Sequence, residues 1–108
     1  MIAEAPTTPG EWRWKRTETD RIELGRDGGP TLFGEHTGRD GWRLGYRVER
    51  EGAVFVDALG NLSNRDDPRA VLAETARYIE DHDLPEEHAG ELLAVEDGSI
   101  RCRRWRIQ

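Results

Sequence analysis

The sequence has little of several residue types, and each scarcity limits what the protein can be. Cys102 is the only cysteine among 108 residues, so no internal disulfide can form and the redox compartment stays undetermined. No apolar run reaches the ~18 residues that a membrane-spanning helix needs. Residues 1–11 lack a basic start followed by an apolar stretch, so we expect no secretory signal and a cytoplasmic location.

Aliphatic and phenylalanine side chains are also scarce. Leu, Ile, Val and Phe together make up 21 of the 108 residues, which is close to the range where disorder begins. The four tryptophans compensate for this scarcity, because each can bury on the order of 200 Å². We therefore predict a single folded domain over residues 11–108, preceded by a flexible lead-in over residues 1–10 that has no periodic pattern.

Lysine is nearly absent, because 15 of the 16 basic residues are arginine. The net charge of −6 is unevenly distributed. Residues 61–98 contain 3 basic and 11 acidic side chains, whereas residues 99–108 contain 4 basic and no acidic ones. The overall acidity argues against general affinity for nucleic acids, but the basic end leaves a small local site open.

The clearest structural pattern is a hairpin over residues 42–59. Apolar residues alternate with polar ones from Trp42 to Val48, as in a strand with one buried face, and Glu51-Gly52 can form a tight turn. Closing the chain at this turn pairs Leu44 with Leu59, Tyr46 with Asp57 and Val48 with Phe55. The apolar residues of the two strands then share one face of the sheet: Trp42, Leu44, Tyr46, Val48, Phe55 and Leu59.

The remaining elements indicate an α+β fold. Residues 11–17, 21–26 and 31–36 read as three earlier strands separated by turns, so an antiparallel meander of about five strands is predicted. Asp67 followed by Pro68 is a typical helix start, and apolar residues recur at helical spacing up to His82. We expect this main helix to lie on the apolar face of the hairpin, with Leu72 and Ile79 in contact with it.

The C-terminal part is less clearly patterned. Asp97-Gly98 marks a turn and residues 99–107 read as a strand, so a C-terminal strand or hairpin is predicted. Residues 85–96 fit either a helix or a strand. We favour a short helix over residues 86–91, followed by a strand over residues 92–96.

Two segments combine cations with aromatic rings and form the candidate binding site. Nucleic-acid binding requires cations for phosphates and flat rings for bases, and both segments provide them. If they were neighbouring strands they would form one Arg–Trp patch. The same arginines could instead neutralise the acidic residues 61–98 and stack on tryptophan rings. The candidate residues are Trp12, Arg13, Trp14, Lys15, Arg16, Arg101, Arg103, Arg104, Trp105 and Arg106.

Nothing in the sequence indicates catalysis, a cofactor or a metal site. His82 and His88 are six residues apart, which does not place both on one helix face as a spacing of four would. Cys102 lies among arginines that would lower its pKa, but no catalytic base is indicated beside it. We therefore expect a small, soluble, non-enzymatic interaction or adaptor module that binds a protein through part of its sheet and the Arg–Trp patch. The alternative is a nucleic-acid-binding regulatory protein that uses the same patch.

Overall fold

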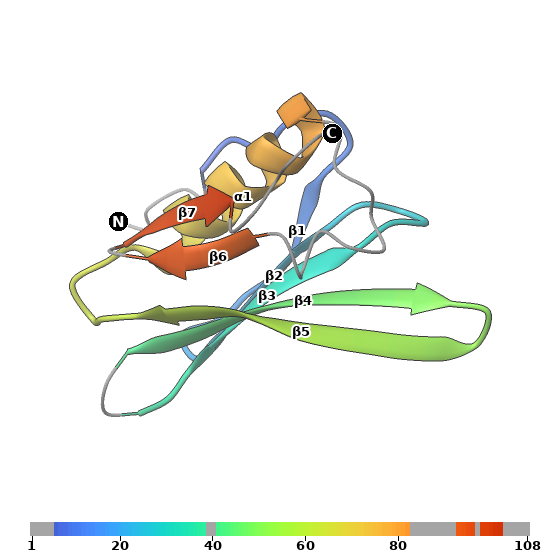
Figure 1. Ribbon diagram of the computed structural model, residues 1–108. Coiled ribbons are helices and arrows are strands. Elements are labelled where there is room, and N and C mark those ends of the chain that lie inside the picture. The colour runs from blue at the N-terminus through green and yellow to red at the C-terminus, as the bar shows by residue number, and fades with distance from the viewer. Residues whose placement is uncertain (1–5, 39–40, 83–92, 97, 103–108) are drawn as a thin grey trace.

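A computed structural model describes residues 6–38, 41–82, 93–96 and 98–102 of the chain. Within these ranges, the side chains of Arg50, Phe55, Glu96, Ser99 and Cys102 lie outside the described part. The predicted α+β class is confirmed: an antiparallel meander is followed by one helix and a C-terminal hairpin (Figure 1). The predicted short helix over residues 86–91 lies outside the described residues.

The meander is a five-stranded sheet in which each strand pairs with its neighbours in the sequence. Its order is β1-β2-β3-β4-β5, and every pairing is antiparallel. Short turns between successive strands favour this arrangement. The strands are β1 (Arg13–Thr17), β2 (Arg21–Gly25), β3 (Thr31–His36), β4 (Trp42–Arg50) and β5 (Ala53–Leu62).

The β4–β5 hairpin has the predicted turn and, near the turn, the predicted register. Glu51 and Gly52 both have positive φ (49° and 82°), as a two-residue type I′ turn requires. Tyr46 pairs with Asp57, and Val48 pairs with residue 55, both as predicted. The predicted pairing of Leu44 with Leu59 is wrong, because Leu44 lies opposite Gly60 in the structure. An extra residue in β5, next to the positive φ of Gly60 (145°), shifts the register there without exposing Leu59.

The helix α1 spans Pro68–His82, as predicted from its start signal. The Asp67 carboxylate accepts a hydrogen bond from the Arg69 backbone N–H (3.0 Å), and the Asp67 carbonyl accepts one from Val71 (3.2 Å). Asp67 is therefore the N-cap, and proline at the first helical position has no N–H left unsatisfied. The buried side of the helix contains Val71, Leu72, Ala73, Thr75, Ala76 and Ile79.

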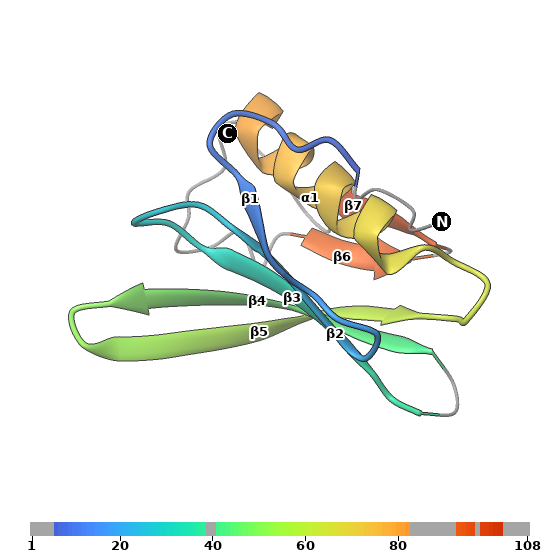
Figure 2. The ribbon, with the colours of Figure 1, turned by 180° about the vertical axis from the view of Figure 1, so that it is seen from behind.

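The second sheet is a hairpin of β6 (Leu93–Glu96) and β7 (Ser99–Cys102). Both α1 and this hairpin lie on the same side of the five-stranded sheet, which we call the inner face (Figures 1 and 2). The helix lies on the inner face, to which the apolar side of β4 and β5 belongs, as expected, and Leu72 and Ile79 share the core cluster with Leu44 and Tyr46. Its main contacts are with β2, β3 and β7. The strand β6 packs against β5, so the β6–β7 hairpin lies above β5.

The core fills the space between these two layers. Leu24, Leu32, Leu44, Tyr46 and Leu72 have no exposed surface. Tyr46 is thus a core residue as the alternation in β4 predicted, whereas the Phe55 side chain lies outside the described part. The other apolar side chains of the core cluster are Trp12, Ile22, Val48, Leu59, Leu62, Val71, Ala76, Ile79, Leu93, Val95 and Ile100.

Candidate interaction surface

The outer face of the five-stranded sheet is made of rows of residues that cross all five strands, and each row includes charged residues. Residues opposite each other in antiparallel strands point to the same face. The registers therefore define one row as Arg13, Gly25, Thr31, Arg47 and Val56, and a second as Arg16, Glu23, Phe33, Gly45 and Ala58. These rows are the basis of the candidate surface.

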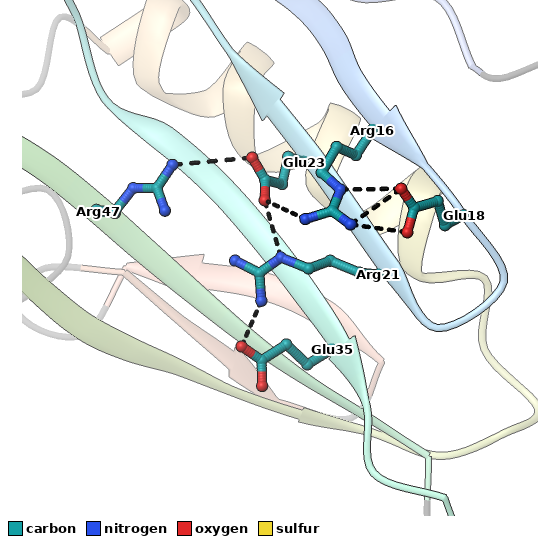
Figure 3. A network of polar contacts seen from close by, with 6 residues as sticks. All are labelled: Arg16, Glu18, Arg21, Glu23, Glu35 and Arg47. Atoms are coloured by element: carbon teal, nitrogen blue, oxygen red, sulfur yellow. Dashed lines mark hydrogen bonds and ion pairs between the residues drawn. The ribbon is translucent and has the colours of Figure 1, made fainter.

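Glu23 is the centre of a network of ion pairs on the outer face (Figure 3). Its side chain is only 12% exposed and accepts a hydrogen bond from Arg21 Nε at 2.8 Å. Arg16 Nη1 lies 3.7 Å and Arg47 Nη2 3.8 Å from its carboxylate oxygens. Arg21 also pairs with Glu35 on β3. Four strands, β1 to β4, thus contribute charges to one network.

Three groups of this network, Arg16, Glu18 and Arg21, have pKa values shifted in the directions expected for ion pairs. The hydrogen bond from Arg16 lowers the pKa of Glu18 below its usual value, and the same bond raises the pKa of Arg16. The hydrogen bond to Glu23 raises the pKa of Arg21. These shifts favour the charged forms of Arg16, Glu18 and Arg21.

Phe33 is the aromatic residue of the outer face, and it is nearly buried there. Its ring lies over Gly45 on β4, since a Cβ atom at Gly45 would come within 2.3 Å of Phe33 Cζ. The guanidinium carbon of Arg21 lies 5.2 Å from the centre of the same ring, at the distance of a cation–π contact. The ring, covered by Arg21, is only 9% exposed.

The outer face differs at the end of the sheet formed by β5. Val54 and Val56 are 55% and 58% exposed, and they are the large apolar residues with the most exposed surface in the described part of the chain. They lie opposite Glu49 and Arg47, respectively, on β4. Two apolar side chains beside two opposite charges are thus presented to solvent on this strand.

Trp12, a predicted base-stacking residue, is buried in the core. Only 2% of it is exposed, and its indole Nε1 donates a hydrogen bond to Glu80 Oε1 on α1 (2.8 Å). Arg26 pairs with the same carboxylate (2.6 Å), and its guanidinium carbon lies 5.5 Å from the Trp12 ring centre. Trp12 therefore joins the start of β1 to the helix and is not available to stack on a ligand.

The rest of the first candidate segment divides between the two faces. Trp14 lies opposite Leu24 on the inner face, is half-buried, and donates from Nε1 to the Pro6 carbonyl (2.9 Å). Arg13 and Arg16 lie on the outer face and are exposed. Lys15 Nζ is 4.0 Å from Asp27 Oδ1. This segment thus contributes cations, but no aromatic ring, to the outer face.

The second candidate segment lies on a different sheet. Arg101 is exposed on β7, which pairs with β6, whereas β1 pairs with β2 at the edge of the five-stranded sheet. Within the described residues, β1 and β7 are therefore not neighbouring strands. Arg103, Arg104, Trp105 and Arg106 lie outside the described residues.

The sequence reading missed the carboxylates of the outer face. Glu23 lies between the inward-pointing Ile22 and Leu24 and therefore points to the outer face, and Glu35 lies opposite Arg21 on that same face. That alternation was the available signal. The strand order was needed to show that Glu23 lies between Arg16 and Arg47.

Within the described ranges, no group of three or more His, Cys, Asp and Glu side chains is close enough together to hold a metal ion. A helix with the length and apolarity required to cross a bilayer is likewise absent from the described residues. No family model, curated protein or solved structure matches this chain.

Proposed function

We propose that this protein is a non-enzymatic interaction module that binds a protein partner through the outer face of its five-stranded sheet. One observation carries the proposal: α1 and the β6–β7 hairpin both lie on the inner face (Figure 2), while the outer face exposes Val54 and Val56 beside the charged residues Glu49 and Arg47. Exposed apolar residues bordered by polar ones are typical of protein-binding surfaces.

The charges of the outer face favour a protein over a nucleic acid. Arg16, Arg21 and Arg47 each lie near Glu23, so a phosphate would have to compete with a carboxylate for them. Mixed charges of this kind suit a partner that presents both signs. The nucleic-acid alternative would depend on exposed cations such as Arg13 and Arg101, without the Trp12 ring.

The test is affinity purification of the tagged full-length chain at low salt, followed by mass spectrometry and the ratio of absorbance at 260 and 280 nm. The Val54→Lys Val56→Lys variant should lose a protein that the wild type retains in stoichiometric amount. The control variant, Ala70→Lys Glu74→Gln, changes the net charge equally on the exposed side of α1 and should retain it.

Two results would contradict the proposal. Equal retention of the partner by the valine variant and the control would place binding elsewhere on the molecule. Stoichiometric nucleic acid in the wild-type sample, released by salt, would favour the alternative function.

A further inference from the structure

The strand β5 is an edge strand whose two halves differ in protection. Its neighbour in the sheet is β4, and no other described strand pairs with it. Near Gly60 its backbone is covered by β6, since a Cβ atom at Gly60 would lie 2.9 Å from the Val95 carbonyl oxygen. Residues 53–57 have no such cover within the described part of the chain, and Ala53, Val54 and Val56 are all exposed.

Within this uncovered half, residues 53–56 lack the features that normally protect an edge. The charged residue Asp57 lies at the end of the stretch, opposite Tyr46 on the inner face. Natural edge strands carry lysine, proline, inward-pointing charges or a bulge that prevents another strand from pairing. Residues 53–56 read Ala-Val-Phe-Val, and the irregularity in the β4–β5 pairing lies further along, opposite Leu44 and Gly45. Residues 53–56 therefore have the composition of a strand that is paired on both edges.

The backbone of this segment has hydrogen-bonding groups on its free side. Arg50 and Ala53 are opposite each other and flank the two-residue turn, which makes them a hydrogen-bonded pair in a type I′ hairpin. Because the pattern alternates, the N–H and C=O groups of Val54 and Val56 point away from β4. A second strand placed there could satisfy both residues.

We propose that β5 pairs with β5 of a second copy of this chain, antiparallel and with residue 55 on the two-fold axis. In this register, Val54 of one copy lies opposite Val56 of the other, so each valine gains an apolar neighbour on the outer face and their outward backbone groups bond to each other. The two sheets then continue as one, with their outer faces on the same side. This inference shares Val54 and Val56 with the proposed function and rests on it in that respect.

Charge selects this register from its neighbours. Arg47 lies beside Val56 and Glu49 beside Val54 on β4. With residue 55 on the axis, each row across the two copies runs from Arg47 of one copy over two valines to Glu49 of the other, so the ends have opposite signs. An axis at Val54 would place two Glu49 carboxylates at the ends of one row, and an axis at Val56 would place two Arg47 side chains there.

The dimer should be weak and concentration-dependent. A single pairing of short strands buries much less than the roughly 1,600 Å² of a standard interface, so we expect a dissociation constant of about 10–100 μM. Sedimentation velocity of the full-length chain from about 5 μM to about 1 mM should show conversion of monomer to dimer. A monomer throughout this range, or growth beyond the dimer, would overturn the inference.

Two variants test whether the β5 edge makes the contact. Val56→Pro removes the outward N–H while leaving the bonds to β4 intact, because proline is tolerated on an edge strand where the N–H faces solvent. Val56→Lys places like charges in the interface and keeps the backbone. Each should weaken the dimer more than tenfold, with circular dichroism unchanged. An undiminished dimer in the folded variants would place the contact elsewhere.

A charge exchange tests the register and separates self-pairing from binding of a different protein. Glu49→Arg puts two cations at the ends of each row and should weaken the dimer roughly fivefold, since both rows change. Adding Arg47→Glu restores opposite signs and should restore the dimer, whereas no recovery would exclude this register. Since both variants keep the valines, loss of self-pairing with retention of another protein would leave the proposed function intact. Self-pairing without retention of any other protein would support the dimer and contradict the proposed function.

Discussion

The two faces of the five-stranded sheet are made from the same strands but behave differently. On the inner face, the side chains of Leu24, Leu32 and Tyr46 lie next to one another and are completely covered. On the outer face, neighbouring strands present arginines opposite glutamates, and solvent reaches most of them. The difference shows that the inner face holds the fold together, because apolar burial contributes more than exposed ion pairs.

The outer face itself changes along the sheet. At β1 to β4 its charges form the network around Glu23, and Phe33 is covered by Arg21. At β5 the valines have no such cover within the described residues. The charged end is therefore satisfied within the chain, whereas the valine end offers apolar surface to another molecule.

The largest expected effect is a difference in the free energy of unfolding between variants on opposite faces of the β4–β5 hairpin. Tyr46→Ala removes a completely buried aromatic side chain and should lower the free energy of unfolding by roughly 3–5 kcal/mol. Val56→Ala, at a site that is 58% exposed, should change it by less than about 1 kcal/mol. Urea unfolding of both variants, below the dimer concentration, measures the difference. Similar losses at the two sites would refute the division between faces.

A smaller loss of stability is expected at Gly45, where the nearly buried Phe33 ring packs on the outer face. Gly45→Ala introduces a Cβ atom that would lie 2.3 Å from Phe33 Cζ, so the ring must move away from the β4 backbone. Overpacking of this kind should cost roughly 1–3 kcal/mol. Combining it with Phe33→Ala removes the clash, so the added cost of Gly45→Ala should nearly disappear in that background. Thermal or urea unfolding of the four proteins gives this coupling.

The smallest effect concerns the exposed ion pair at the β1–β2 turn. Because Arg16 lowers the pKa of Glu18 in the folded state, the pair stabilises the fold above the unfolded pKa of about 4.3. This contribution is lost as the pH falls through the lower folded pKa. Carboxyl NMR should show Glu18 titrating below about 4.3, and Arg16→Gln should raise its midpoint. An unchanged midpoint would mean that the pair does not persist in solution.

Local patterns determined which segments form strands and where the helix begins. Alternation from Trp42 to Val48 placed Tyr46 on the buried face, and the Asp67-Pro68 pair located the start of α1. These features depend on neighbours a few residues away, through side-chain alternation and hydrogen bonds at a helix end. They could therefore be read before any long-range contact was known.

Contacts between distant segments were decided only by the tertiary structure. The sequence contains Trp12 and Glu80 but not the fact that they meet, so a tryptophan that is buried against the helix was read as a binding residue. The same limit applies to β1 and β7, which belong to different sheets, and to Glu23, whose arginine partners come from three strands. Side-chain periodicity fixes which face a residue occupies. Which elements cover that face depends on how the helix and the second sheet share the apolar surface, and no local pattern records this.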